Sequence, residues 1–519
     1  MAESACLSPD YEPSLPVSEK SNPLTRDIDQ ASANCIVRML QACDAQMFQE
    51  ETGATYQRLL SKQVVETLME VAKKVERILK DPRDSVVVLS GCGTSGRLAF
   101  LITVKSTFNR ALRELNQSSV YSYIIAGGDR YAGFFVTLNK KHVCEGKKRV
   151  LFIGISCGLS APFVAGQLDL CLQHPEVYTP VLVGFNPTHQ ARDESIPGCT
   201  FTFRSVVQRM QELSKSQKAF LINPAVGPEA ISGSSRMKGG SATKILLEVI
   251  LSAAHAATFT NTPITYKFDL FGTELSATLC FSLQCGRRVC YLGWGSLATL
   301  GLIDASECIP TFGAGERSLI LDDRLLLFVY ALFPFSLDYV NAEKMKKSIL
   351  PLSQQWELST KLLLNAVSTG AHVLKGKIYQ NYMIDVQVTN SKLYCRAARL
   401  LQKMSGCPES QCEEALLKTI YRVDKLTADI TSSDIATHTR TARNRTKVVP
   451  LALVCLLTGC SLMEAETHLE QQPIVREAVE ACLAPIRKRT QESPSFFIYF
   501  LFSHYVCVFI CSRYMMFTL

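Results

Sequence analysis

A turn rich in glycine and hydroxyl side chains follows the first short apolar run of the chain. Gly91–Gly96 reads GCGTSG and comes directly after Ser85–Leu89, where a helix is expected to begin. Glycines let the backbone approach a ligand, and the free N–H groups at a helix N-terminus attract anions. Thr94 and Ser95 add two hydroxyl donors. The pattern predicts a cradle for a phosphate monoester.

Two alternatives to a phosphate cradle remain open at this turn. The string also fits the G-x-G-x-x-G pattern of dinucleotide-binding proteins. That pattern requires an acidic residue about 20 residues further on, after the next strand, whereas Asp129 comes too late. Hydroxyl groups in the turn also suit a terminal phosphate better than a pyrophosphate. The second alternative is a tight structural turn without a ligand.

A second hydroxyl-bearing turn, Ile155–Ser160, follows another apolar run. It reads ISCGLS, so Ser156 and Ser160 flank Gly158 where a helix is expected to begin. A single Ser-x-Gly turn is usually only a helix cap. Two such turns at the carboxyl ends of neighbouring parallel strands, however, meet where open α/β sheets bind ligands. Together the two turns predict a sugar-phosphate site.

A third polar segment, Gly233–Lys244, opens an apolar helix and reads GSSRMKGGSATK. Ser235–Lys238 fits the S-x-x-K motif of penicillin-binding enzymes, but no S-D-N or K-T-G partner occurs in a suitable context. We therefore do not expect an enzyme of that class. A capped helix start is one interpretation of the segment. The other is that its hydroxyls and a cation help to bind an anionic ligand.

The elements that position these turns alternate between strand and helix. Helix-compatible segments separate four apolar runs, and a helix with apolar residues every three or four positions precedes them over Val64–Ile78. The alternation predicts an α/β fold with a doubly wound parallel sheet across about residues 85–255. The predicted strands are Ser85–Leu89, Tyr121–Ala126, Arg149–Ile155 and Thr179–Gly184.

The pattern of the first turn recurs in outline about 200 residues later, which predicts a second copy of the α/β unit. Val88–Gly96 and Tyr291–Ala298 each read as a strand that ends in glycines and leads into a helix. The second copy is short, because Arg317–Trp356 holds too few strand and helix alternations to complete it. After Trp356 the chain turns helical, and similar motifs at 406–417 and 459–469 predict paired helical hairpins.

The predicted organisation has five segments and ends in a hydrophobic tail. A transmembrane helix needs about 20 apolar residues, and the apolar run Phe496–Cys511 is shorter and interrupted by Ser503-His504. We expect no membrane partner, with a membrane anchor as the alternative. The segments are a polar N-terminal arm (1–30), a first α/β domain with leading helices (31–270), a shortened second α/β domain (271–355), an all-α cap (356–485) and a basic, then hydrophobic, tail (486–519).

The composition narrows the class of protein. The chain has 519 residues, of which 47% are hydrophobic and 20% charged, and this excludes disorder over most of its length. The net charge of +8 is small for this length, so we expect no nucleic-acid partner. The 20 cysteines include no C-x-x-C pair, and the N-terminus reads as no secretory signal. We expect reduced thiols, no metal site, and a cytosolic or nuclear protein.

Longer strings around these motifs resemble the sugar-isomerase (SIS) domain family, with matches over about residues 14–480. The narrower resemblance is to the branch that holds bacterial N-acetylmuramic acid 6-phosphate etherases and vertebrate glucokinase regulatory proteins. It implies two SIS domains, the second truncated, and an all-α cap. The strings are SEKSNPLTRDID at 18–29, GCGTSGRLAF at 91–100, GISCGLSAPFVAG at 154–166, VLVGFNP at 181–187, NPAVGPEAISGSSRMKGGSATKILLE at 223–248, DASECIPTFG at 304–313 and STGAHVLKGKIYQNYMIDVQVTNSKL at 368–393.

The chemistry of the matched strings favours a regulator over an etherase. In the etherase pattern, G-x-G-T-S-G-R and D-A-S-E-C belong to one domain, which places a carboxylic acid beside the phosphosugar. Here the first unit keeps the turn without the acid, and the second keeps Glu307 but has Ser296–Thr299 in place of the turn. The acidic helix expected after Arg130 is also missing. Elimination of a lactyl ether needs a positioned acid and base. We therefore expect a pseudo-enzyme regulator, with an etherase-like lyase as the alternative.

The resemblance also implies a fructose-phosphate site without a cofactor. Glu307 is expected to reach the sugar hydroxyls from the second unit, and Lys377 to neutralise phosphate charge. The alternatives are an ordinary surface acid and a solvated lysine at a helix end. The residues that the resemblance places in the site are Thr94, Ser95, Ser156, Cys157, Gly158, Ser160, Ser234, Ser235, Glu307 and Lys377.

The function that the resemblance implies is allosteric inhibition of glucokinase, within carbohydrate metabolism and glucose homeostasis. Fructose 6-phosphate would favour the inhibitory conformation, and fructose 1-phosphate would relieve inhibition. One site can do this only if the two ligands stabilise different arrangements of the units and the cap. The resemblance further implies residence in the nucleus and the cytoplasm.

Overall fold

The structure, a computed structural model, describes residues 15–48, 56–105, 107–126, 146–196, 198–260, 352–389, 391–472 and 474–481, with short pieces between 289 and 321. Contacts divide the chain into two units, residues 1–384 and 385–519, and each unit is described by itself. Most of the predicted second α/β domain (271–355) lies outside the described residues. The segment that follows Arg130 and the tail (486–519) also lie outside them, and the predicted domain boundaries stay predictions.

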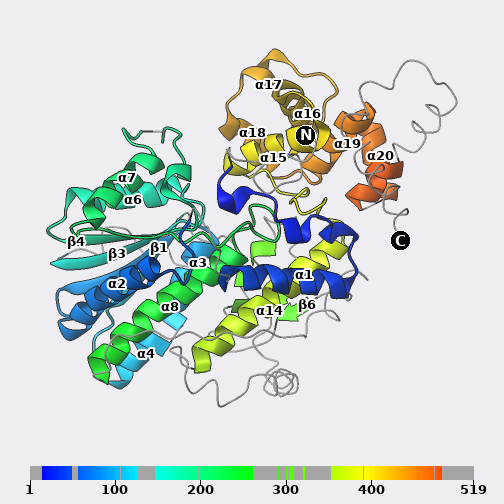
Figure 1. Cartoon of the computed structure of the whole chain (residues 1–519). Coiled ribbons are helices and arrows are strands. Elements are labelled where there is room, and N and C mark those ends of the chain that lie inside the picture. Colours follow the sequence, from blue (N-terminus) through cyan, green and yellow to red (C-terminus); the bar gives the residue numbers. More distant parts are fainter. Residues whose placement is uncertain are drawn as a thin grey trace, which may run out of the picture. The chain divides into compact units, whose positions relative to one another are not determined.

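A parallel sheet of five strands forms the centre of the first unit (Figure 1). β1 pairs with two neighbours, so that Val87 lies opposite Tyr121 on one side and Leu151 on the other. The order of the strands is β2-β1-β3-β4-β5, and the predicted doubly wound α/β fold is confirmed. The strands are β1 (Ser85–Gly91), β2 (Tyr121–Ile125), β3 (Arg149–Ile155), β4 (Tyr178–Val183) and β5 (Phe220–Ile222).

Helices cover both faces of the sheet, which explains why its strands are apolar throughout. Successive side chains of a strand point to opposite faces, so each strand contributes to two cores. Val87 of β1 packs in the core that contains α2 and α8, whereas Val88 packs in the core that contains α6 and α7 (Figure 1). These helices are α2 (Lys62–Lys80), α6 (Pro162–Gln173), α7 (Phe203–Ser214) and α8 (Lys238–Phe259).

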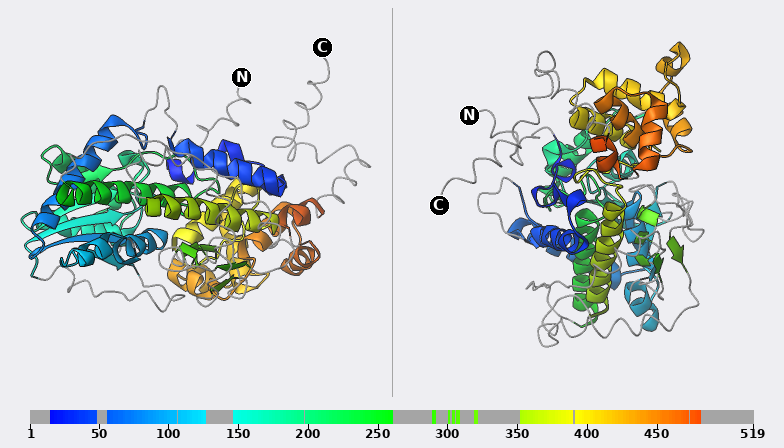
Figure 2. Two further views of the ribbon diagram at one scale, coloured as in Figure 1. Left: turned by 90° about the horizontal axis from the view of Figure 1, so that it is seen from below. Right: turned by 90° about the vertical axis from the view of Figure 1, so that its right-hand side faces the viewer.

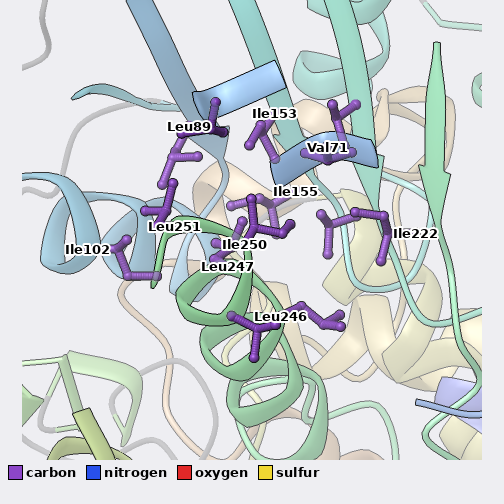
Figure 3. Packing of buried hydrophobic residues seen from close by; sticks show 14 of the residues in the cluster. Val71, Leu89, Ile102, Ile153, Ile155, Ile222, Leu246, Leu247, Ile250 and Leu251 are labelled. Carbon is purple, nitrogen blue, oxygen red and sulfur yellow. The ribbon is translucent and has the colours of Figure 1, made fainter. Parts of the chain in front are cut away.

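The larger core lies between the sheet and α8. Figure 3 shows Leu89 and Ile155 from the strands near Leu247 and Ile250 of α8, with Val71 of α2 beside them. Every residue of α8 from Lys238 to Ala254 is buried. The helix has the length and hydropathy of a membrane span, but its apolar surface is mostly covered inside the unit. This core fixes the start of α8 against the ends of the strands.

Further helices and a pair of short strands belong to the first unit. α1 packs along α14, and α14 packs against α8 (Figure 2). β6 and β7 pair in parallel, with Val289 opposite Leu319, and both strands fall within the predicted second α/β domain. The bounds are α1 (Ala33–Ala45), α3 (Thr94–Phe100), α4 (Thr107–Glu114), α14 (Leu352–Leu374), β6 (Val289–Tyr291) and β7 (Leu319–Leu321).

The described part of the N-terminal arm, residues 15–30, is hydrogen-bonded to distant segments of the first unit. Asn22 is fully buried, and its Nδ2 donates to the carbonyl oxygen of Pro228 at 2.8 Å and to Oε1 of Gln46 at 2.9 Å. Asn381 Nδ2 in turn donates to the carbonyl oxygen of Asn22 at 3.0 Å. The arm therefore holds together segments that are far apart in the sequence.

The described part of the second unit consists of helices, as predicted for the C-terminal region. Gly406 and Gly459 have φ values of 70° and 69°, which turn the chain between α15 and α16 and between α19 and α20. Both pairs pack together, so the predicted helical hairpins are confirmed. The helices are α15 (Ser391–Ser405), α16 (Glu409–Tyr421), α17 (Ala428–Ser432), α18 (Ile435–Ala442), α19 (Val448–Thr458) and α20 (Leu462–Gln471).

Candidate functional site

The strand order creates one switch point, between β1 and β3. The chain leaves β1 for β2 on one side of it and then returns to β3 on the other side. Ligands of open α/β sheets bind at the carboxyl ends of the strands at such a point. Both predicted hydroxyl turns follow these two strands, whose last residues, Gly91 and Ile155, lie opposite each other. The sheet therefore brings the two turns together.

The turn after β1 depends on glycine because it folds back tightly on the strand end. A Cβ atom on Gly96 would lie 2.7 Å from the carbonyl oxygen of Gly91, and Gly93 has a φ of 53°, where glycine is favoured. α3 begins at Thr94, which is half-buried, and Ser95 is buried. The tight turn places both hydroxyls in the first turn of α3, where the backbone N–H of Ser95 donates to the carbonyl oxygen of Cys92 at 3.2 Å.

The turn after β3 has both a capping and a lining role. Ser156 Oγ accepts hydrogen bonds from the backbone N–H groups of Ser160 at 3.1 Å and Ala161 at 3.2 Å, so Ser156 caps the start of α6. A Cβ atom on Gly158 would lie 3.3 Å from Ser160 Oγ and 3.9 Å from Oγ of Ser18 in the arm. Gly158 and Ser160 therefore face the N-terminal arm.

Cys157 joins the two turns to the start of α8. Its Sγ lies 3.6 Å from Ser95 Oγ and 3.8 Å from Thr243 Oγ1. It would lie 3.3 Å from a Cβ atom on Gly239, so the glycine leaves room for the thiol. The structure thus brings Ser95 and Cys157, two predicted site residues, into contact with each other, and Cys157 into contact with the helix that begins in the third polar segment.

The N-terminus of α8 is already occupied by a carboxylate. Glu229 accepts hydrogen bonds from the backbone N–H groups of Lys238 at 2.8 Å and Gly239 at 2.9 Å. Burial raises the pKa of Glu229 to about 7, although these two hydrogen bonds and the Lys238 ammonium oppose the shift. The backbone N–H groups of Lys238 and Gly239 are therefore not free to bind a ligand at the start of α8.

A buried arginine, Arg236, contacts several polar side chains from distant parts of the first unit. Arg236 Nη1 donates to Asp304 Oδ1 at 2.8 Å, and Nη2 donates to Ser368 Oγ at 2.7 Å and Thr369 Oγ1 at 2.9 Å. Glu307 Oε2 lies 3.5 Å from Nη1. Burial disfavours the charge of Arg236, but the nearby carboxylates outweigh burial and raise the pKa of the guanidinium above its ordinary value.

Two predicted site residues, Glu307 and Ser234, carry polar atoms without hydrogen-bond partners among the described residues. Within the described part of the chain, Glu307 Oε1 and Ser234 Oγ are buried and accept or donate no hydrogen bond. Glu307 is 3% exposed, so it is not the surface acid of the alternative interpretation. Buried polar atoms are normally satisfied, so both atoms have unused capacity for hydrogen bonds. Ser235, the next residue after Ser234, is half-buried.

Lys377 lies beyond the C-terminal end of α14. Its backbone N–H donates to the carbonyl oxygen of His372 at 3.1 Å, and its side chain is half-buried. Burial lowers the pKa of His372 to about 3, and the charges of Arg236, Lys375 and Lys377 add to this effect. The role of Lys377 in neutralising phosphate charge stays a prediction.

Sequence reasoning missed Lys361 and Asn365, which lie on α14 near Arg236. Lys361 Nζ donates to the carbonyl oxygen of Arg236 at 2.8 Å, and Arg236 Nη1 donates to Asn365 Oδ1 at 3.4 Å. Lys361, Asn365 and Thr369 are spaced four apart, so they share one helix face. That spacing of polar residues in a mostly apolar helix is the signal that could have identified them. Among the described residues, no group of three or more His, Cys, Asp or Glu side chains could hold a metal ion.

Comparison with known proteins places this site in a family. A profile of the glucokinase regulatory protein N-terminal SIS domain matches residues 70–134 and 135–172, and a profile of the C-terminal lid domain of glucokinase regulatory protein matches residues 380–479. An N-acetylmuramic acid 6-phosphate etherase from Vibrio campbellii is 25% identical, over 38% of this chain and 78% of the etherase. A tagatose-6-phosphate ketose/aldose isomerase structure from Escherichia coli has 13% identity and a TM-score of 0.36, covering 69% of this chain and 97% of that one, and carries no argument about function.

Regulatory proteins match over far more of the chain. The glucokinase regulatory protein of Homo sapiens is 40% identical over 594 aligned positions, covering 93% of this chain and 95% of the human protein. That of Xenopus laevis is 39% identical over 601 positions, covering 93% and 96%. Because 594 positions exceed the 519 residues of the chain, the relative has residues at positions where this chain has none. From this extent of identity, the chain belongs to the glucokinase regulatory protein family.

Proposed function

We propose that this protein binds a fructose phosphate at the switch point between β1 and β3 and that the bound ligand controls its inhibition of glucokinase. Fructose 6-phosphate promotes inhibition in this proposal, and fructose 1-phosphate relieves it. Family membership and the names of the relatives support a regulator with glucokinase as its partner. The choice of the two fructose esters rests on the resemblance and on the geometry of the site.

The contact between the two hydroxyl turns carries the proposal. Ser95 Oγ and Cys157 Sγ lie 3.6 Å apart at the carboxyl ends of adjacent strands. A phosphate monoester needs several donors around one point, and the turns after β1 and β3 bring the Ser95 hydroxyl and the Cys157 thiol together there. Glu307 Oε1 is a buried acceptor without a partner in the described part of the chain, which suits a sugar hydroxyl.

The carboxylates of the site support binding rather than turnover. Asp304 and Glu307 both interact with Arg236, Asp304 at 2.8 Å and Glu307 at 3.5 Å. Both carboxylates are thus engaged by one guanidinium, whereas elimination of a lactyl ether needs both a positioned acid and a positioned base. We therefore favour a regulator that is not an enzyme. The protein would act in the nucleus and the cytoplasm.

An inhibition assay tests the proposal. Glucokinase activity is measured with the purified full-length chain, alone and with each fructose phosphate, beside a Ser95→Tyr control that fills the turn. We expect inhibition that fructose 6-phosphate deepens and fructose 1-phosphate relieves, and a control that responds to neither ester. Absence of inhibition under all conditions would contradict the regulator. Release of lactate from N-acetylmuramic acid 6-phosphate would instead establish the etherase-like lyase.

A further inference from the structure

Lys361 of α14 is a buried cation without a paired carboxylate. Its side chain is 4% exposed, and Nζ donates to the carbonyl oxygen of Arg236 at 2.8 Å and lies 3.5 Å from Asn365 Oδ1. In the part of the chain that the structure describes, Lys361 forms no ion pair. Lys244, which is equally buried, pairs with both Glu248 and Glu357. A buried ammonium whose direct contacts are only neutral oxygen atoms is costly, and Lys361 lacks the direct carboxylate contacts that Lys244 has.

Lys361 borders the same space as the turn after β1. A Cβ atom on Gly240 would lie 3.2 Å from Lys361 Nζ and 3.5 Å from Cγ2 of Thr94. Both side chains therefore approach one point beside the start of α8, and glycine keeps that point open. Lys361, which has no direct ion pair, and the predicted phosphate turn thus border one place in the fold.

Two more buried polar atoms near Arg236 lack partners within the described residues. Asn365 Nδ2 donates no hydrogen bond, and Glu307 Oε1 accepts none, although Asn365 is 2% and Glu307 is 3% exposed. An unsatisfied donor, an unsatisfied acceptor and a cation without a direct ion pair are complementary to a molecule that carries both hydroxyl groups and negative charge. A sugar phosphate is the simplest molecule of that class.

We infer that Lys361 and Asn365 complete the sugar-phosphate site, with Lys361 as the counter-ion of the phosphate ester and Asn365 Nδ2 as a donor to the sugar. This inference rests on the proposed function, because it assigns residues to the same site. It adds two residues of α14 to the site that the two turns form. α14 thereby links the ligand directly to Arg236, through the carbonyl oxygen that Lys361 already contacts.

Proton uptake on ligand binding distinguishes a lysine that acts as the counter-ion of the ligand from a lysine with only a structural role. Burial lowers the pKa of Lys361, and the charged groups around it are Asp44 on α1, Arg236, Asp304 and Glu307. A dianion placed beside Lys361 raises that pKa, so binding takes up a proton, and the affinity falls as the pH rises between the two pKa values. Fructose without a phosphate supplies no such charge and should cause no uptake at this lysine.

Titration calorimetry with the full-length protein tests the inference. Binding of fructose 6-phosphate is measured between about pH 7.5 and 9.5, where the ester is already a dianion, in two buffers of different ionisation enthalpy. We expect proton uptake by the wild type and affinity lower by about 10- to 100-fold in Lys361→Met, with the uptake lost. Lys361→Arg should keep more of the affinity but lose the uptake, because arginine does not titrate. Lys74→Met, which removes a half-buried lysine of α2 beside Phe220, should bind like the wild type.

The possible outcomes separate the inference from the proposed function. If the wild type binds the ester and Lys361→Met keeps both affinity and proton uptake, the inference is wrong and the proposed site stands. If the wild type binds neither fructose ester, the proposed site itself fails, and the inference fails with it. Should Lys361→Met not fold by circular dichroism, the wild type and Lys361→Arg decide: unchanged uptake in Lys361→Arg would also overturn the inference.

Discussion

The sulfur atom of Cys157 lies 3.6 Å from the hydroxyl oxygen of Ser95, although 62 positions separate the two residues in the chain. The parallel pairing of β1 with β3 creates this proximity, because it places the ends of both strands at one edge of the sheet. The thiol is therefore a reporter for whatever occupies the space between the two turns.

We expect fructose 6-phosphate to slow alkylation of Cys157 by iodoacetamide. A ligand held at the two turns covers the thiol, which is only 7% exposed before binding. Peptide mass spectrometry at timed intervals measures the rate at each cysteine. Cys35 and Cys199 are exposed and serve as internal controls whose rates should not change. Equal rates at Cys157 with and without the ester would place the ligand elsewhere.

We expect opposite effects on stability from adding a methyl group at two glycines. In Gly96→Ala the new Cβ would lie 2.7 Å from the carbonyl oxygen of Gly91, so the free energy of unfolding should fall by about 2–3 kcal/mol. In Gly166→Ala, inside α6, a Cβ meets nothing within 4 Å, and the variant should gain about 0.5–1 kcal/mol. Urea denaturation measures both. A stable Gly96→Ala variant would contradict the tight turn.

Arg236→Met should be strongly destabilising. The change leaves Asp304 and Glu307 buried without their guanidinium partner, and removal of one member of a buried ion pair typically costs about 3–5 kcal/mol. The matched control is Lys148→Met, which breaks an exposed ion pair with Asp84 and should leave the free energy of unfolding essentially unchanged. Equal effects of the two changes, measured by urea denaturation, would argue against a buried network.

Because of Glu229, the free energy of unfolding should fall as the pH rises from about 5 to 8. Burial raises its pKa from 4.5 to about 7, so between these values the folded protein binds more protons than the unfolded chain. The stabilisation present below pH 4.5 is then lost as the pH approaches 7, by up to about 3 kcal/mol.

Glu229→Gln tests this assignment through the difference in slope. Urea denaturation at several pH values should show a smaller loss of stability in the variant than in the wild type. Glu464→Gln is the control, because hydrogen bonds to Ser461 lower the pKa of Glu464 and its contribution is lost only as the pH falls. Parallel curves for the wild type and Glu229→Gln would refute the buried carboxyl as the source.

Asn22→Ala should weaken the attachment of the N-terminal arm. The variant loses the hydrogen bonds to Gln46 and Pro228 and leaves a buried carbonyl unsatisfied, at a cost of about 1–3 kcal/mol. Limited proteolysis of the arm, followed by urea denaturation, measures the effect. Leu24→Ala, at a side chain that is 42% exposed, is the control and should change little. Unaltered protease resistance in Asn22→Ala would refute this role.

The sheet could be predicted from the sequence because most of its strands are continuous apolar segments, which can be recognised without knowledge of distant residues. Runs such as Arg149–Ile155 are long and continuously apolar, and they give the order of strands and helices directly. β5 was not predictable, because Phe220–Ile222 is only three residues long and no periodicity can be read from it. The two turns were predictable because each lies immediately after such a strand.

The contribution of α14 to the site could not be predicted, because it depends on contacts between residues that are far apart in the sequence. Lys361 contacts the carbonyl oxygen of Arg236 across 125 positions, and no local pattern specifies that partner. The role of Ser156 was open for a related reason: a cap and a ligand contact look alike in sequence, and the hydrogen bonds to Ser160 and Ala161 establish the cap. The buried state of the arm depends likewise on its remote partner Asn381.

The arm also has a consequence for synthesis on the ribosome. Ser21 Oγ donates to Asn381 Oδ1 at 3.0 Å, across 360 positions, and the backbone N–H of Gln380 donates to Asp29 Oδ2 at 2.8 Å, across 351 positions. At about 5–20 residues per second, the ribosome needs roughly 20–70 s to supply these partners after the arm has emerged. Throughout that interval the nascent arm has no docking site at residues 380–381, so chaperones that hold unfolded segments have longest access to the beginning of the chain.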